Sequence, residues 1–536
     1  MRGYAGKFLE VDLTNQNIKE VRFDEEILRQ YLGGRGLATK ILWDRLGRRW
    51  EEIDPLGPEN ILLMLTGPLT GFAGGARICV SGKSPQSNGV TGSTLSCEFP
   101  IELKCAGYDG IIFTGKAEKP LYLSIIDSDV ELKDASHLWG KDGKETVKIL
   151  VKEGRESLER KKSRRGLWRD LGIVYIGPAG ERMVRVASVN SKWAHAAGYG
   201  GYGAVMGSKN LKAVIVKGTG PLPEVADMER VVELMKELTK VNSREIVWRW
   251  WGTGVAGYGV GSAYSSEPVM NWQEEWHDER SFGVDKFERF WAKHYWGDFG
   301  CAITCLKLAV IKSGRFAGAI TDNPDYENQA YLGTNLGVFS AEENIYLTAL
   351  ADDLGFCGIQ CGNLLGFTAE LYQRGILTKE DLGGIDLKWG NAEAFADLMK
   401  MIAERKGIGD ILAEGTYRAA LKISEMKGID VTKYAVVEKG IGIGAHGIRS
   451  RKDYPGYESY PCSVQGGDHT SIAYLPLDHS NSELRLALYD SGVVCWFNFS
   501  MNEKEAYPIL WKIIKAVTGW DITPEKWYNE MARRII

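Results

Sequence analysis

Hydrophobic positions in the first part of the chain repeat every second residue. Leu9, Val11 and Leu13 alternate with acidic residues, which is the pattern of a strand with one buried face. Short runs of β-branched and aromatic residues follow at 110–113, 121–126, 173–176 and 213–216. Glycine- and proline-rich turns separate these runs. The sequence therefore predicts a β-rich N-terminal domain.

The period changes to 3.6 residues after the turn-rich segment 218–223. Val231, Val232, Met235 and Leu238 are expected to share one helical face. The same spacing recurs at Phe395, Leu398, Met399 and Ile402. A β-rich domain followed by mainly helical chain indicates an α+β fold.

The amino-acid composition is that of a globular protein and gives no sign of nucleic-acid binding. The chain has 536 residues, 44% hydrophobic and 25% charged, with a net charge of −4, so we expect about three globular domains and no nucleic-acid partner. No apolar run approaches the roughly 20 residues of a membrane span, and no signal-peptide core is visible at the start. We therefore expect a cytoplasmic protein. Its nine cysteines, an odd number, indicate thiols and metal ligands more than disulfides.

One cysteine pattern suggests an iron–sulfur cluster. Cys301 and Cys305 are separated by three residues, Asp298 precedes the first by three positions, and Cys495 lies far downstream. Cubane clusters usually take four thiolates, so one ligand here would be an oxygen or would be missing. On spacing alone, two buried thiols beside a solvated aspartate remain an alternative.

Three glycine clusters, at 33–36, 198–203 and 252–254, do not support nucleotide binding. The first follows a predicted helix where a dinucleotide fingerprint needs a strand, and no phosphate-loop motif occurs in the chain. Glycines let backbone approach a bulky ligand closely. We therefore place a large planar or phosphorylated cofactor near Gly198 and Gly200, with tight turns between strands as the alternative interpretation.

The run 203–213, Gly-Ala-Val-Met-Gly-Ser-Lys-Asn-Leu-Lys-Ala, resembles the signature of the tungsten-containing aldehyde:ferredoxin oxidoreductases. Further matches lie at 32–38, 106–110 and 518–521, so the resemblance spans essentially the whole chain. It implies tungsten, rarely molybdenum, held by the dithiolenes of two pterins, with an adjacent iron–sulfur cluster. It also implies a β-rich pterin-binding domain and two mainly helical domains, which we place at 1–217, 218–425 and 426–536.

The resemblance also assigns cofactor ligands. Asp352 and Cys357 begin and end a pterin-binding motif, and Asp490 begins a second such motif, which ends at Cys495. A carboxylate is an apt acceptor for pterin ring N–H groups. Main-chain carbonyls of Thr94 and Ala196 match the positions that hold a magnesium ion between the pterin phosphates. Arg77 matches the arginine that lies between pterin and cluster.

Asp298, Cys301 and Cys305 occupy the family's C-x2-C-x3-C cluster motif, and Cys495 supplies the remaining thiolate. The resemblance therefore implies either a 4Fe-4S cluster with Asp298 on one iron or a 3Fe-4S cluster.

Three further residues match the family's active site. Glu327 is expected to act as general base toward water, His446 as proton donor or carbonyl-orienting group, and Tyr326 as hydrogen-bond donor. Four other residues are interpreted as structural or as supports of the site: His195, Cys361, Cys462 and His469.

The implied reaction is oxidation of a small aldehyde to a carboxylic acid, with electrons passing through the cluster to ferredoxin or to an iron–sulfur subunit. An oligomer or multisubunit complex is expected. Alternatives are the catalytic subunit of another redox complex, such as an aromatic acyl-CoA reductase, and a catalytically silent electron-transfer subunit. The chain stops at Ile536, short of the family pattern, so we expect a more open substrate cavity or a wall supplied by another subunit.

Overall fold

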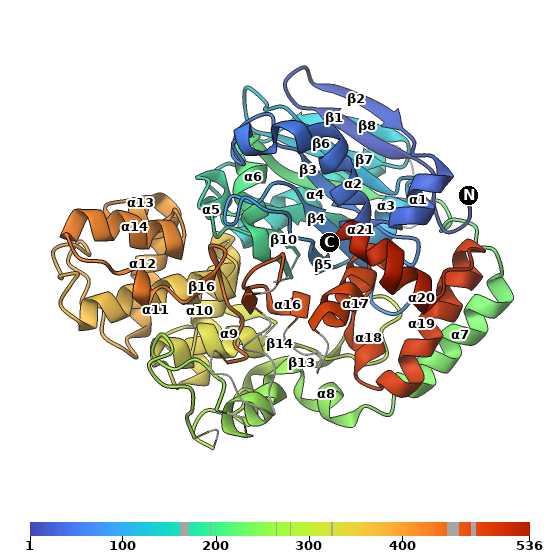
Figure 1. Ribbon diagram of the computed structural model, residues 1–536. Helices are drawn as coiled ribbons and strands as arrows, with labels where there is room; N and C mark the ends of the chain where they lie inside the picture. The colour runs from blue at the N-terminus through green and yellow to red at the C-terminus, as the bar shows by residue number, and fades with distance from the viewer. Residues whose placement is uncertain are drawn as a thin grey trace.

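A computed structural model describes residues 1–160, 171–192, 195–263, 265–278, 280–322, 325–447, 460–461, 463–472 and 479–536. Figure 1 shows strands gathered in the N-terminal part and mainly helices in the rest of the chain, which confirms the α+β fold. Among the residues described, no helix is both long and apolar enough to cross a membrane.

Two six-stranded sheets form the N-terminal part. The first has the order β2-β1-β6-β3-β4-β5 and the second β11-β10-β9-β12-β7-β8. Their strands are β1 Phe8–Asp12, β2 Asn17–Val21, β3 Leu62–Leu65, β4 Arg77–Ser81, β5 Ser93–Ser96, β6 Gly110–Thr114, β7 Leu121–Ile126, β8 Asp129–Asp134, β9 Gly172–Tyr175, β10 Val189–Ser191, β11 Ala196–Ala197 and β12 Leu211–Lys217. The four β-branched runs of the sequence thus correspond to β6, β7, β9 and β12.

The sheets pack against each other through alternating side chains. Leu9 and Val11 of β1 share one apolar core with Leu123 of β7 and Val214 of β12. Residues on the opposite faces belong to other cores, as expected for strands whose side chains alternate between two sides. The predicted alternation in β1 is therefore correct.

Helices pack on the outer faces of the two sheets, and helices make up most of the remaining chain (Figure 1). They are α1 Glu25–Tyr31, α2 Gly34–Leu46, α3 Phe99–Cys105, α4 Gly143–Arg160, α5 Pro178–Glu181, α6 Tyr202–Ser208, α7 Met228–Asn242, α8 Ile246–Trp251, α9 Tyr326–Tyr331, α10 Ala341–Leu354, α11 Gly358–Gln373, α12 Ala392–Glu404, α13 Ile408–Leu412, α14 Thr416–Lys427, α16 His469–Ile472, α17 His479–Gly492, α18 Phe497–Ser500, α19 Glu503–Thr518, α20 Pro524–Lys526 and α21 Ala532–Ile535.

The apolar residues predicted to share one face of α12 do so, whereas one residue predicted for the buried face of α7 lies outside it. All four apolar residues predicted for α12 are buried. In α7 the buried apolar residues are Val231, Leu234, Leu238 and Val241, and Val232 is 44% exposed. Val232 follows Val231 by about 100° around the helix and so points away from the buried stripe.

A small sheet in the middle of the chain was not predicted. Strands β13 Trp291–Trp296, β14 Leu306–Val310 and β15 Ile320–Thr321 form it, and a hairpin joins β16 Val437–Glu438 to β17 Ile441–Gly442. These strands are short and only partly buried, so they lack a clear apolar alternation. The loop between β13 and β14 carries the expected cluster motif.

The apolar cores group the helices differently from the expected domain limits. Position 217 coincides with the end of β12, whereas position 425 falls inside α14. Helix α7 shares a core with α2, α17 and α19, which joins the two ends of the chain. Helices α10 to α14 surround a separate core. The packing therefore places α7 with the C-terminal helices.

Candidate active site

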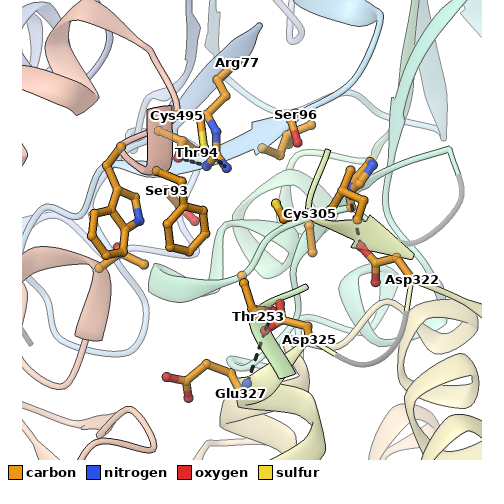
Figure 2. A pocket seen from close by; sticks show the side chains of 18 of the residues that line it. Arg77, Ser93, Thr94, Ser96, Thr253, Cys305, Asp322, Asp325, Glu327 and Cys495 are labelled. Carbon is orange, nitrogen blue, oxygen red and sulfur yellow. Dashed lines mark hydrogen bonds and ion pairs between the residues drawn. The ribbon is translucent and has the colours of Figure 1, made fainter. Parts of the chain in front are cut away.

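One cavity brings together nearly all the residues expected at the site. Its lining includes Arg77, Thr94, Ala196, Gly198, Asp298, Cys301, Cys305, Tyr326, Glu327, Asp352, Cys357, Asp490 and Cys495. Figure 2 shows Arg77, Thr94 and Cys495 on one side of this cavity and Glu327 on the other. These residues come from both sheets, from the β13–β14 loop and from helices far apart in sequence, so the tertiary fold alone assembles the site.

The candidate cluster ligands come from two segments. Cys301 and Cys305 lie in the β13–β14 loop, where Cys301 N donates to Asp298 O over 3.0 Å. Cys495 lies between α17 and α18, in a segment that pairs with the start of β4 through Val494. Burial raises the pKa of Cys301 and Cys305, and the neighbouring Cys495 raises both further. Clustered thiols that resist ionisation become thiolates when a metal binds them, so their chemistry fits an iron–sulfur cluster.

Asp298 is partly buried beside these thiols. Burial raises the pKa of its carboxyl group, and the positive charges of His195 and Arg77 oppose that rise. The carboxyl group lines the same cavity as the three cysteines. It therefore occupies the place where an oxygen ligand to iron is expected.

Arg77 connects the candidate cluster side with the rest of the cavity. Its Nη1 donates to Thr94 Oγ1 over 3.0 Å, and its Nη2 donates to Cys495 Sγ over 3.5 Å. No residue in the described part of the chain accepts a hydrogen bond from its buried Nε. A buried donor of this kind is costly unless a bound group satisfies it, so Arg77 fits a position between pterin and cluster.

Asp352, at the end of α10, has a carboxyl group that suits a pterin. Its Oδ2 accepts a hydrogen bond of 2.8 Å from Thr321 Oγ1. Burial and the nearby Asp322 raise its pKa well above the usual value. Ring N–H donors would relieve this cost, because hydrogen bonds favour the ionised carboxylate.

Asp490, in α17, has a similar buried carboxyl group. Its Oδ2 lies 3.8 Å from Nη1 of Arg35, and no described residue hydrogen-bonds to it. Burial raises its pKa to about 7, against the charge of Arg35. Gly34 fixes this arrangement, because a Cβ there would lie 2.0 Å from the Asp490 carbonyl oxygen. An acceptor without a donor at the cavity wall again fits a pterin.

Of the two glycines expected at the cofactor, only Gly198 reaches the cavity. A Cβ on Gly198 would lie 3.0 Å from Sγ of Cys357. Gly200 instead packs into the protein, where a Cβ would lie 2.2 Å from Thr91 Oγ1 and φ is +88°. The placement of Gly200 at the cofactor is therefore not supported, and the alternative of a tight turn describes it.

Glu327 begins a group of buried side chains with acid–base character. Asp325 caps α9 by accepting from Glu327 N over 3.2 Å. Glu327 Oε1 lies 2.6 Å from Nε2 of His446 and 3.4 Å from Nε2 of His469. Its Oε2 accepts a 2.9 Å hydrogen bond from Ala445 N. The fold thus holds one carboxylate against two imidazoles.

Burial controls the protonation of this group. It raises the pKa of Glu327 and lowers the pKa of His446 to about 3 and of His469 to about 4. Both imidazoles are therefore neutral at ordinary pH. A carboxyl group with a raised pKa beside neutral imidazoles can accept and pass on protons.

Tyr326 has a different contact from the one expected. Its hydroxyl donates to the carbonyl oxygen of Ala445 over 2.7 Å. This bond holds the segment that carries His446. It also uses the hydroxyl proton of Tyr326 for a contact with the backbone. Tyr326 still lines the cavity.

Two histidines that were interpreted as structural or as supports of the site line the cavity. His469 lies beside Glu327 and 3.1 Å from the Tyr199 hydroxyl through Nδ1. His195 lines the cavity and its Nδ1 lies 3.3 Å from Asp322 Oδ2. Neither residue stands in a recognisable motif, so no sequence signal identified them. Cys361 is fully buried in α11, in agreement with a structural role, and Cys462 lies outside the described residues.

Known proteins resemble the chain over its whole length. A family model of the aldehyde ferredoxin oxidoreductase N-terminal domain matches residues 8–218, and a model of domains 2 and 3 of that family matches residues 229–536.

Two relatives and one solved structure illustrate this resemblance. The WOR-like subunit of an aliphatic sulfonate oxidoreductase from Pyrococcus furiosus is 55% identical, over 100% of this chain and 85% of that protein. A tungsten-containing aldehyde ferredoxin oxidoreductase from Pyrococcus abyssi is 34% identical, over 100% of this chain and 88% of that protein. The active-site complex BamBC of benzoyl-coenzyme A reductase with 1,5-dienoyl-CoA aligns with a TM-score of 0.81 and 26% identity, over 99% of this chain and 88% of that chain.

Proposed function

Because the chain belongs to the aldehyde ferredoxin oxidoreductase family, we propose that it is the catalytic subunit of a tungstopterin complex that oxidises aldehydes to carboxylic acids. Water supplies the oxygen, and two electrons leave through an iron–sulfur cluster to ferredoxin or a partner subunit. The observation that carries this proposal is that Glu327 and His469 line the cavity that also holds the candidate cluster ligands. His446 is fully buried behind the cavity wall and contacts Glu327.

The proton balance explains why such a group is needed. Oxidation of an aldehyde, RCHO + H2O → RCOO⁻ + 3H⁺ + 2e⁻, releases three protons and two electrons. Tungsten held by two pterins supplies the two-electron acceptor when it is bound. Glu327 accepts a proton from the attacking water, and His446 and His469 hold the carboxylate in place. Glu327 is 5% exposed and His446 fully buried, so little bulk water reaches the carboxylate that would take this proton.

The remaining cavity residues are proposed to hold the cofactors. Asp352 and Asp490 would accept hydrogen bonds from the two pterins, with Gly198 and Cys357 in the adjoining wall. Carbonyl groups at Thr94 and Ala196, on the neighbouring strands β5 and β11, are the proposed magnesium ligands.

The cluster proposal uses the other side of the cavity. Cys301, Cys305 and Cys495 would bind iron as thiolates and Asp298 as an oxygen ligand, either in a 4Fe-4S cluster or beside a 3Fe-4S cluster. Arg77, which hydrogen-bonds the Cys495 thiol, would lie between this cluster and a pterin.

An aliphatic sulfonate is a second candidate substrate, favoured by the 55% identity to a subunit of an aliphatic sulfonate oxidoreductase. Its oxidation, RCH2SO3⁻ + H2O → RCHO + SO3²⁻ + 3H⁺ + 2e⁻, releases the same numbers of protons and electrons. The Glu327 group would therefore serve either reaction. An acyl-CoA reductase role has weaker support, from a structural neighbour at 26% identity, and the buried Glu327–His446 pair argues against a catalytically silent subunit.

A dye-reduction assay tests these proposals. Protein expressed anaerobically with tungsten would be supplied with benzyl viologen and, in parallel, with aldehydes of increasing size and with short aliphatic sulfonates. The proposal expects viologen reduction with aldehydes. Reduction with sulfonates and sulfite release would select the second candidate. No reduction with either class, in protein that contains tungsten and iron, would contradict both.

A further inference from the structure

Two buried ionisable side chains, Glu267 and His277, lie outside the cavity lining and have no part in the proposed reaction. They stand at the two ends of the segment 267–277. Nε2 of His277 lies 3.1 Å from Oε1 of Glu267. Glu267 is fully buried and His277 is 7% exposed. Burying a carboxylate and an imidazole together is costly unless the pair serves the fold or the chemistry.

The backbone between these two residues has an unusual conformation. Met270, Asn271 and Trp272 have φ angles of 49°, 55° and 61°, in the left-handed region that residues with a side chain seldom adopt. Met270 N donates to Thr334 O and Asn271 N donates to Asn335 O, each over 3.1 Å. Strain of this kind persists only where neighbouring structure holds it, and it is common at functional sites. Here the strained turn brings the two ends of the segment together.

The segment that carries Glu267 touches the segment that carries His446. A Cβ on Gly447 would lie 2.9 Å from Oγ of Ser266, so the chains on either side of this contact are close. Burial lowers the pKa of His446, and the negative charge of Glu267 opposes that fall. His446 therefore contacts Glu327, over 2.6 Å, and lies within the electrostatic reach of Glu267.

Glu267 has one carboxylate oxygen in use and one available. Its Oε1 accepts a 3.0 Å hydrogen bond from Thr334 Oγ1 and also faces His277. No residue in the described part of the chain donates to its buried Oε2. An ionised carboxylate oxygen without a donor is a strong proton acceptor.

His277 is the last buried group before solvent on this side. Its neighbours in the chain are open to water, since Trp276 is 53% exposed and the side chain of Asp278 is 42% exposed. Its ring packs against Phe339, with centroids 5.7 Å apart, and Phe339 is itself 39% exposed. A proton on His277 is therefore close to bulk water.

We propose that Glu267 and His277 receive protons from His446 and carry them to solvent. This inference rests on the proposed function, whose reaction releases protons at Glu327, where little bulk water reaches. In each passage, Glu327 gives its proton to one nitrogen of His446, and the other nitrogen of His446 gives a proton to Glu267. Glu267 then protonates His277, which releases a proton to water. One proton enters and one leaves, and no electron moves. Carboxylates and imidazoles suit such a relay because each both accepts and donates protons.

Separate measurements of electrons and protons in the anaerobic holoenzyme test the inference. The enzyme would turn over, in weak buffer, the aldehyde or sulfonate that reduces benzyl viologen. Viologen absorbance reports the electrons, and the fluorescent indicator pyranine reports protons in bulk water. The variants are Glu267→Gln, which keeps the shape of the side chain, and His277→Ala, which leaves space for added imidazole as a proton carrier. His137→Ala is the matched control, because the side chain of His137 is 47% exposed.

The inference predicts that both relay variants lose turnover by at least about tenfold in weak buffer, with KM unchanged. In His277→Ala, bulk protons should appear later than electrons, and imidazole should restore most of the rate. Imidazole should not affect the wild type or His137→Ala. Tungsten and iron content should be equal in all four proteins.

Two results would overturn the relay. The first is wild-type turnover of either relay variant in weak buffer. The second is a loss in His277→Ala that imidazole does not relieve although the metals are retained, because such a loss identifies a purely structural role. Wild type that contains tungsten and iron but reduces no viologen with either substrate class would instead refute the proposed function itself.

Discussion

Oε1 of Glu327 lies 2.6 Å from Nε2 of His446, and both side chains are buried. Since burial lowers the pKa of His446 to about 3, its imidazole is neutral at ordinary pH. The close approach of this neutral ring orients the Glu327 carboxylate at the cavity wall. The pair is therefore organised before any substrate arrives.

Replacing Glu327 by glutamine removes the proton acceptor and keeps the shape of the side chain. We expect turnover to fall by about 10²- to 10⁴-fold, the usual contribution of general acid–base catalysis. Tungsten and iron content should not change, because Glu327 is not assigned to either cofactor. Single-turnover and steady-state rates with viologen measure the effect, and a variant as fast as the wild type would remove Glu327 from the mechanism.

The pH dependence should report the raised pKa of Glu327. A general base must be deprotonated, so the rate should rise as pH rises through that pKa. His469 Nε2 lies 3.4 Å from Glu327 Oε1, and the dipole of its neutral imidazole favours the ionised carboxylate, so His469→Gln, which removes the ring, should move the acid limb of the profile to higher pH. His137→Gln is the control, because His137 is exposed and pairs with Glu153. An acid limb that does not move in His469→Gln would show that His469 does not influence the base.

Asp298→Cys tests the oxygen ligand at the candidate cluster. A thiolate is a softer iron ligand than a carboxylate, so the variant should have a four-thiolate cluster with an altered EPR spectrum and an altered reduction potential. Iron per chain should be four in the variant. Asp298→Ser supplies a weaker oxygen donor for comparison. If iron content and EPR spectra are the same in wild type and Asp298→Cys, Asp298 is not at the cluster.

Asp490→Asn should stabilise the cofactor-free protein and weaken pterin binding. The pKa of Asp490 is about 7 in the folded protein and about 3.9 in an unfolded chain. The folded protein therefore binds the proton of Asp490 more tightly than the unfolded chain does. The free energy of unfolding decreases as pH rises from about 4 to about 7.

Asparagine at position 490 has no charge, so it avoids the cost of burying an ionised carboxylate. Without cofactor, the variant should therefore gain about 1–2 kcal/mol of unfolding free energy at pH 8 and little at pH 4. Thermal denaturation at the two pH values measures the gain, and pterin content measures the loss of binding. The exposed carboxylate of Asp521, paired with Lys515, provides the control variant Asp521→Asn. A loss of stability at pH 8 would show that the ionised Asp490 is already stabilised by the protein.

Local patterns predicted the elements whose apolar residues recur with a regular period. Leu9 and Val11 in β1, and Phe395 and Leu398 in α12, alternate or repeat as their elements require. The strand Trp291–Trp296 was missed because it is aromatic, short and partly exposed, so no clean alternation marks it.

The sequence predicted only those residues of the candidate site that stand in a recognisable sequence motif. Glu327, Asp352 and the cysteines stand in such motifs, and the cavity brings them together. His469 reaches Glu327 through tertiary packing alone, which no local spacing reveals. Gly200 was placed wrongly because a glycine required by close packing against Thr91 looks in sequence like one required by a ligand.

Quantitation of tungsten and iron, combined with EPR spectroscopy, on anaerobically purified protein tests the account most directly. We expect one tungsten and three or four irons per chain, with the spin of the oxidised cluster distinguishing three-iron from four-iron forms. Protein that contains neither metal after anaerobic, tungsten-supplemented expression would contradict it.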